Sequence, residues 1–201
     1  ISLLERLEYT YLQGSAEQEV KNVIYDSRKV EEGSLFICIR GAVVDGHKFV
    51  PDVIAKGAKV LVVEEAVEAP EDVTVILVKD SRYAMAFISA AYFGYPAEKL
   101  KTIGITGTKG KTTTTYMVKS ILENAGYKVG LIGTIEAIIG DKVIPAKNTT
   151  PESYVIQEYF HEMVEAGCDC VVMEVSSQGL MLHRTQGFIF DFGIFTNIEP
   201  D

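Results

Sequence analysis

The chain has 201 residues, 47% of them hydrophobic, and a formal net charge of −9. This is enough apolar material for two domains with cores of their own, and the acidic balance argues against a general nucleic-acid surface, which needs a basic stripe. The apolar runs are strand-sized and no basic leader with a cleavage site opens the chain, so we expect a cytoplasmic protein that does not enter the membrane.

Three cysteines, Cys38, Cys168 and Cys170, form an odd set without metal-ligand spacing. We expect them to be buried free thiols. The chain begins at Ile1 and stops at Asp201 just after a strand-like run, as expected of a piece of a longer protein.

Strands and helices alternate in the first half of the chain. Strands are expected over 20–24, 35–39, 60–63 and 73–78, with a short helix over 49–58 and a longer helix that Ser81 caps. Gly94-Tyr95-Pro96 ends that helix, and a charged run follows. We place a domain boundary there, between a small α/β domain over 1–98 and a parallel-sheet domain over 99–201.

A polar group follows the first of these strands. Asp26, Ser27 and Arg28 place a carboxylate, a hydroxyl and a guanidinium at a strand end, where they suit a uracil, ribose or phosphate group. A turn that caps itself through Asp and Ser explains the same residues. The glycine-bounded loop over 41–47 could equally bind a ligand or only connect two elements.

A glycine loop lies between a strand and a helix in the second half. The strand over 101–106 is apolar and β-branched, and the helix after the loop has a predicted apolar stripe of Val118, Ile121, Leu122 and Ala125. Free amides of a first helical turn bind phosphate, and Gly107 and Gly110 let the backbone approach it. Lys111 can reach terminal phosphates and the Thr112 hydroxyl can bind Mg²⁺. The spacing is G-x-x-G-K-T, because Ile105 stands where the usual loop has glycine; a tight turn beside a surface lysine is the alternative.

Further strands are expected at 128–133, 170–173 and 188–196, with a hairpin about Gly140-Asp141. In Asn148-Thr149-Thr150-Pro151-Glu152, Thr150 is a natural N-cap and Pro151 suits the first helical position, although the same residues could hold a phosphate or sugar.

Glu174 ends a buried strand on the side of the sheet that carries the glycine loop. It is a candidate Mg²⁺ ligand, and a supporting residue or helix cap is the alternative.

Together these motifs resemble the Mur ligase family, and within it the MurE type, which adds an amino acid to a UDP-N-acetylmuramoyl dipeptide in peptidoglycan synthesis. The matching stretches are 26–28, 45–47, 107–113, 148–152, 173–177, His183-Arg184 and 195–197. The resemblance implies a UDP-MurNAc-binding first domain and a truncated central ATPase domain with a P-loop-type parallel sheet. It also implies a monomer that uses ATP and Mg²⁺ to form an amide through an acyl phosphate.

The resemblance carries residue roles with it. It implies ATP contacts from Gly107, Thr108, Lys109, Gly110, Lys111, Thr112 and Thr113. It implies Mg²⁺ ligands at Thr112 and Glu174, with Lys111 on the β- and γ-phosphates as the third catalytic residue. It implies substrate contacts from Tyr25, Ser27, Arg28, Asn148, Thr149, Thr150, Ser176 and Arg184.

The chain also departs from the family pattern. Lys109 replaces a frequent asparagine, and Leu182 stands where some relatives have glutamine. Of the family's Asp-His pair only Asp201 is available, and its carbamylated lysine and third domain would lie beyond the chain. We therefore expect these 201 residues alone not to complete the reaction. The alternatives are a MurF-type dipeptide-adding ligase, against which Asn148–Glu152 weighs, and a non-catalytic module that binds nucleotide or UDP-sugar.

Overall fold

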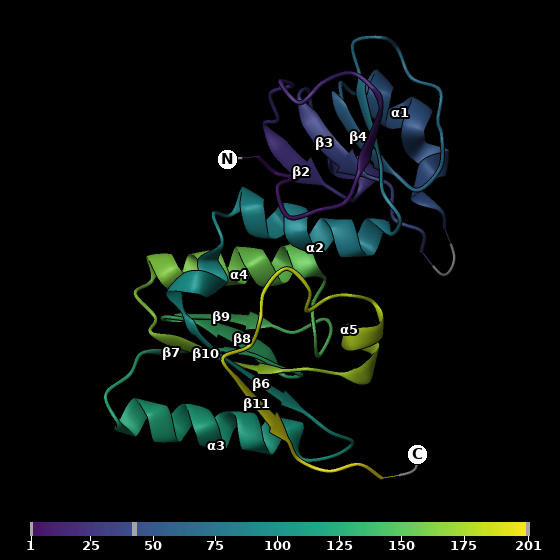
Figure 1. Ribbon diagram of the computed structural model, residues 1–201. Helices are drawn as coiled ribbons and strands as arrows, with labels where there is room; N and C mark the ends of the chain where they lie inside the picture. The colour runs from purple at the N-terminus through teal and green to yellow at the C-terminus, as the bar shows by residue number, and fades with distance from the viewer. Residues whose placement is uncertain (1, 42–43, 200–201) are drawn as a thin grey trace. The chain divides into compact units, whose positions relative to one another are not determined.

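The computed structural model describes residues 2–41 and 44–199 and divides into two compact units, Ser2–Met85 and Ala86–Asp201 (Figure 1). The division falls within helix α2 (Ser81–Tyr92). The domain boundary that we predicted after residue 98 lies further along the chain and stays a prediction. Residues 42–43 of the glycine-bounded loop, and Asp201, lie outside the described residues.

The first unit is built on a five-stranded sheet in the order β1-β5-β4-β3-β2. The strands are β1 Thr10–Gln13, β2 Asn22–Ile24, β3 Ser34–Ile37, β4 Val60–Val63 and β5 Thr74–Leu77. Strands β2 to β5 are parallel, and β1 joins β5 antiparallel. Helix α1 (Val50–Ala55) and the 3₁₀ turns η1 (Ser27–Lys29) and η2 (Gly46–Phe49) lie in the connections.

The second unit is a six-stranded sheet in the order β11-β6-β10-β7-β8-β9. Its strands are β6 Lys101–Thr106, β7 Val129–Ile132, β8 Glu136–Ile139, β9 Lys142–Pro145, β10 Cys170–Glu174 and β11 Phe192–Phe195. The parallel part is β11, β6, β10 and β7. The helical elements are η3 Pro96–Lys99, α3 Lys111–Asn124, α4 Ser153–Glu165 and α5 Ser177–Met181.

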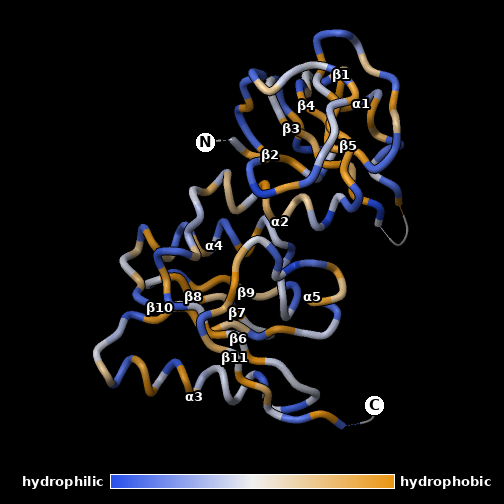
Figure 2. The backbone as a smooth tube through the Cα atoms, viewed as in Figure 1, coloured by the Kyte–Doolittle hydropathy of each residue, from blue (hydrophilic) through white to orange (hydrophobic). Residues whose placement is uncertain are grey.

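Strand β10 is buried on both faces, as its continuous apolar sequence requires. Val171 and Met173 pack with α4, whereas Cys170 and Val172 pack with α3. Figure 2 shows β4 and most of β10 as hydrophobic tube, which matches their central places in the two sheets.

The connections after β6 and β10 leave the sheet on opposite faces. The helix after β6 is α3, whereas the chain after β10 brings Phe188 and Phe190 into the cluster formed by α4. Ligands of open α/β sheets bind beyond the carboxyl ends of two strands whose connections leave in this way. The glycine loop and Glu174 both lie at the carboxyl ends of these two strands.

Most predicted elements are confirmed within one or two residues, including the hairpin, whose β8 and β9 pair antiparallel across Gly140. All three cysteines are free and buried. Within the described ranges, no helix combines the length and apolar character needed to cross a bilayer.

Two predicted helix caps are wrong. Asp80, not Ser81, caps α2: its Oδ1 accepts from the Tyr83 amide at 2.8 Å, while the Ser81 hydroxyl donates to Glu64 Oε1 at 2.7 Å. Helix α4 begins at Ser153 rather than Pro151, because the Thr150 hydroxyl bonds the backbone after β10 instead of capping the helix.

The apolar stripe predicted for α3 is half right. Val118 and Leu122 pack against the sheet, but Ile121 at the flank of the helix is 65% exposed and Ala125 is exposed as well. Strand β1 was not predicted, because its alternating exposed and half-buried residues lack an apolar run.

Candidate functional site

The glycine loop takes a backbone path that side chains would block. Gly107 has φ +140°, and a Cβ there would lie 2.1 Å from Thr196 Oγ1. Gly110 has φ +82° directly before α3, and a Cβ there would meet nothing within 4 Å. The loop is therefore held tightly at its start and open at its end, where the free amides of α3 begin.

Residues after β11 hold this loop in place. The Lys109 amide donates to Asn197 Oδ1 at 2.9 Å, and the Lys109 carbonyl accepts from Thr196 Oγ1 at 2.7 Å and from Asn197 Nδ2 at 3.1 Å. The Lys109 ammonium pairs with Glu199 at 2.5 Å. The positive charge that Lys109 brings in place of the family's frequent asparagine is therefore neutralised by the Glu199 carboxylate.

Lys111 folds back over the loop. Its Nζ donates to the Gly107 carbonyl at 2.7 Å, with the Thr108 carbonyl at 3.4 Å. Thr113 is exposed in the first turn of α3. The ammonium therefore lies at the loop itself, where a bound phosphate would compete with these carbonyls for it.

Glu174 joins two loops beside this site. Its Oε2 accepts from Thr112 Oγ1 at 3.0 Å and from Thr134 Oγ1 at 2.9 Å, and its Oε1 accepts from the Thr134 amide at 3.0 Å. The residue is fully buried, yet its carboxylate is directed at the Thr112 hydroxyl of the loop and not into the apolar core.

The donor set suits Mg²⁺. While Thr112 donates its proton to Glu174, the lone pairs of its hydroxyl oxygen stay available to a hard cation. The described residues form no group of three or more His, Cys, Asp or Glu side chains that could hold a metal. A small number of protein ligands is sufficient for Mg²⁺, because phosphate oxygens and water molecules complete its coordination shell.

The predicted substrate-binding residues of the second unit lie around the same strand end. Thr149 Oγ1 is 3.1 Å from Thr134 Oγ1, and Asn148 is exposed. The Thr150 hydroxyl donates to the Glu174 carbonyl at 3.0 Å and accepts from the Ser176 amide at 2.9 Å, so it is engaged inside the protein.

Arg184 braces the segment before α4. Its Nη1 donates to the Thr150 carbonyl at 3.0 Å, and its Nη2 pairs with Glu152 at 2.8 Å. The Ser176 hydroxyl accepts from the Gly179 amide at 3.1 Å and caps α5. The structure thus brings Thr149, Thr150, Ser176 and Arg184 together at the carboxyl ends of β7 and β10.

In the first unit, Asp26 and Arg28 pair with each other. Asp26 caps η1 and accepts from the Arg28 Nε at 2.9 Å and Nη2 at 2.7 Å, which lowers the pKa of Asp26 to about 2. Lys56 Nζ donates to the Ser27 carbonyl at 2.8 Å, and Tyr25 is half-buried nearby in sequence. The self-capping turn is therefore present, and the exposed Arg28 guanidinium lies beside it.

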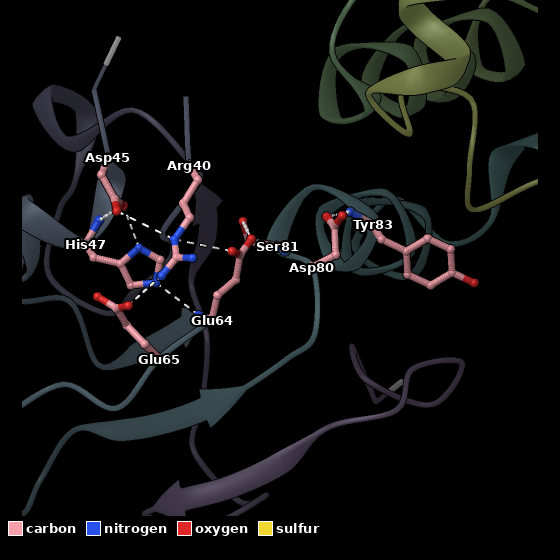
Figure 3. Close-up of polar contacts among 8 residues, drawn as sticks. All are labelled: Arg40, Asp45, His47, Glu64, Glu65, Asp80, Ser81 and Tyr83. Carbon is pink, nitrogen blue, oxygen red and sulfur yellow. Dashed lines mark hydrogen bonds and ion pairs between the residues drawn. The ribbon is translucent and has the colours of Figure 1, made fainter. Parts of the chain in front are cut away.

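A second polar network anchors the loop that carries Asp45-Gly46-His47 (Figure 3). Asp45 Oδ1 lies 2.6 Å from His47 Nδ1, and His47 Nε2 accepts from the Glu64 amide at 3.0 Å, so the ring donates through Nδ1. Arg40 reaches Asp45 at 3.6 Å and Glu64 at 3.4 Å. Hydrogen bonds from the His47 amide and ring lower the pKa of Asp45.

A parallel sheet with a glycine loop after one strand, a lysine and threonine at the following helix start and a carboxylate on the neighbouring strand defines a nucleotide-binding domain of the phosphate-loop class. The chain belongs to the Mur ligase family. The model of the Mur ligase family catalytic domain matches residues 19–93, and that of the Mur ligase middle domain matches 105–201.

Curated and solved proteins agree with this assignment. The chain is 53% identical over 200 residues to the UDP-N-acetylmuramoyl-L-alanyl-D-glutamate--2,6-diaminopimelate ligase of Clostridium perfringens, covering 100% of this chain and 41% of that protein. A solved structure of a ligase with the same name aligns with a TM-score of 0.76 at 24% identity, over 90% of this chain and 37% of the other. The MurF structure from Acinetobacter baumannii aligns with a TM-score of 0.53 at 27% identity, over 80% and 31%. The chain thus spans about two fifths of the relatives it matches.

Our reading of the sequence missed Thr134 as a partner of Glu174, and it did not foresee the bonds from Thr196 and Asn197 to the loop. The position of Thr134 just past β7, next to β10, was the available signal, because carboxyl ends of neighbouring parallel strands meet at one edge.

Proposed function

We propose that the complete protein is an ATP-dependent ligase of the MurE type, which joins 2,6-diaminopimelate to UDP-N-acetylmuramoyl-L-alanyl-D-glutamate in the cytoplasm. The observation that carries the proposal is the bond from Thr112, at the start of α3 directly after the glycine loop, to Glu174 of the neighbouring strand β10, in a chain 53% identical to a ligase of that name. The proposed domains are a UDP-MurNAc-binding domain over 1–98 and a central ATP-binding domain over 99–201.

The proposed roles follow from the contacts. The amides of 107–113 bind the phosphates of ATP, and Lys111 exchanges its loop carbonyls for the β- and γ-phosphates. Thr112 and Glu174 hold Mg²⁺, which when bound neutralises charge on the phosphates. Thr149 and Arg184, with Asn148, Thr150 and Ser176, lie where a muramyl peptide reaches the carboxyl ends of β7 and β10.

In the reaction, a substrate carboxylate oxygen attacks the γ-phosphorus and ADP leaves, which gives an acyl phosphate. The amine of the amino acid attacks the acyl carbon, phosphate leaves and the amine gives up a proton as the amide forms. This chemistry asks the protein mainly to position groups and to offset spreading charge, which loop amides and Lys111 can do.

We assign recognition of the UDP end of the substrate to the first unit. Tyr25, Ser27 and the exposed Arg28 suit the UDP group, since a guanidinium and a hydroxyl match its phosphate and ribose oxygens. A monomer remains our proposal for the oligomeric state.

A MurF-type ligase is the second candidate, since a MurF structure shares the fold with a TM-score of 0.53. Phosphate release by the complete protein from ATP separates the two, measured with UDP-MurNAc-L-Ala-D-Glu and either 2,6-diaminopimelate or lysine, and with the diaminopimelate-containing tripeptide substrate and D-Ala-D-Ala. We expect release with diaminopimelate and a loss of at least about 100-fold in Lys111→Ala and Glu174→Ala, as for other residues that stabilise the transferred charge. Unchanged ligation in both variants would refute the enzyme proposal, and release only with the tripeptide substrate and D-Ala-D-Ala would support the MurF type.

A further inference from the structure

Glu174 is approached from both neighbours of its strand. Strand β10 lies between β6 and β7. Thr112 comes from the first turn of α3, after β6, and Thr134 from the turn after β7, and each donates its hydroxyl to Glu174 Oε2, at 3.0 and 2.9 Å. The connections that follow two different strands therefore meet at one carboxylate oxygen.

Thr134 makes the larger share of these contacts. Its amide donates to Glu174 Oε1 at 3.0 Å while its hydroxyl donates to Oε2, so one residue holds both oxygens. Holding both oxygens fixes the plane of the carboxylate, which the single bond from Thr112 leaves free to turn. Hydrogen bonds to a carboxylate are about twice as strong as neutral ones.

The turn before Thr134 is shaped for the same contact. A Cβ on Gly133 would lie 2.5 Å from Glu174 Oε1, so glycine lets the carboxylate approach the backbone. Thr134 Oγ1 donates to Glu174 and so accepts from Thr149 Oγ1 at 3.1 Å. A line of hydrogen bonds thus runs from Thr149 through Thr134 and Glu174 to Thr112.

We propose that Thr134 is a positioning residue of the nucleotide site, which orients Glu174 for the magnesium ion of bound nucleotide. The inference rests on the proposed ATP site. Groups that orient metal-binding side chains typically contribute 10- to 100-fold to metal affinity. The ordinary alternative is that Thr134 only closes the turn between β7 and β8.

The test is calorimetric binding of ADP to the complete protein, with excess Mg²⁺ and with EDTA. We expect Thr134→Val, which keeps the shape and removes the hydroxyl, to reduce the Mg²⁺-dependent gain in ADP affinity about 10- to 100-fold and to leave the affinity in EDTA unchanged. Thr134→Ser restores the hydroxyl and should bring the gain back to within about threefold of wild type. Thr10→Val, the same change at an exposed strand residue of the first unit, is the matched control.

The outcomes are distinct. A Mg²⁺-dependent gain in Thr134→Val equal to wild type overturns the positioning role and leaves the proposed function standing. An equal loss of affinity in Mg²⁺ and EDTA overturns it as well, in favour of a general role in the turn. Absence of Mg²⁺-dependent ADP binding in the wild-type protein overturns this inference and the proposed nucleotide site together.

Discussion

A single hydroxyl, that of Thr150, satisfies two backbone groups in the interior. It donates to the Glu174 carbonyl and accepts from the Ser176 amide, and the residue is only 1% exposed. A buried backbone group left without a partner costs about 1–3 kcal/mol. This hydroxyl therefore keeps the chain after β10 in place whatever else Thr150 contacts.

We expect Thr150→Val to destabilise the segment after β10 by about 2–4 kcal/mol, since two backbone groups lose their partner, whereas Thr150→Ser should cost about 1 kcal/mol for a lost methyl group. Hydrogen exchange of the peptide over 175–181, read by mass spectrometry in the complete protein, checks this. Equal protection in the valine and serine variants would contradict it.

The Asp26–Arg28 pair makes the stability of the fold depend on pH. Because Arg28 lowers the folded-state pKa of Asp26 to about 2, against about 3.9 unfolded, the pair contributes stability above pH 4 and loses it as pH falls from about 4 to about 2. The gain in stability is small, because the Arg28 side chain is 86% exposed.

In Arg28→Gln we expect the pKa of Asp26 to return toward its usual range, and Lys29→Gln, which removes a neighbouring charge but no hydrogen bond to the carboxylate, should change it far less. Carboxyl NMR titration, with the Asp26 signal assigned by its loss in Asp26→Asn, measures both. A pKa that stays near 2 in Arg28→Gln would show that other groups cause the shift.

At the scale of elements, the two glycines of the loop differ in what an added side chain would cost: backbone strain alone at Gly110, and backbone strain together with steric overlap at Gly107. At Gly110 only the backbone conformation is at stake, about 1–2 kcal/mol, since no atom lies within 4 Å. At Gly107 the added Cβ would also overlap Thr196 Oγ1 and lie 2.8 Å from the Asn197 carbonyl. The loop must then separate from the residues after β11.

We therefore expect Gly107→Ala to weaken ADP binding by more than about 100-fold and Gly110→Ala by about tenfold, the latter following from a conformational cost near 1.4 kcal/mol. Calorimetry on the complete protein compares them. Gly110→Asn is the control, because asparagine tolerates positive φ and should bind better than the alanine variant. The reverse order of the two alanine variants would contradict this account of the loop.

Strand positions could be predicted from the local sequence, whereas helix starts could not be predicted exactly. The strands near Val60 and Cys170 are apolar runs with clear ends, so their places follow from the sequence alone. The predicted caps of α2 and α4 were wrong because each hydroxyl bonds another partner. The Ser81 hydroxyl donates to Glu64, and the Thr150 hydroxyl bonds the backbone after β10. Such choices depend on partners distant in sequence.

The candidate site divides in the same way. The glycine loop and Glu174 are local signals at strand ends, and the geometry brings them together through Thr112. Thr134 belongs to no motif, and Asn197 belongs to a matching stretch that does not show its bonds to the glycine loop, since both contacts depend on which strands are neighbours in the sheet. Only the strand order reveals them.

At the scale of the whole sheet, the two edges of the second unit differ. Strand β9 contains Pro145 and the Lys142–Glu162 ion pair, features that discourage pairing with other chains. Strand β11 is equally short, its four residues include neither proline nor a charged side chain, and Phe192 and Phe195 are 60% and 62% exposed. An open edge with exposed aromatic residues is a surface for association.

We expect the 201-residue chain, produced by itself, to self-associate through β11 in spite of its net charge of −9. Phe195→Lys should lower the association constant by about tenfold or more, because it removes apolar area from the edge and places there an ammonium group that would have to lose its water on association. Val143→Lys on β9, at a residue 56% exposed, is the matched control and should change little. Sedimentation velocity over a concentration series measures both variants. If Val143→Lys lowers the association constant as much as Phe195→Lys does, the added charge alone governs association. If neither variant lowers it, β11 is not the surface that joins the copies.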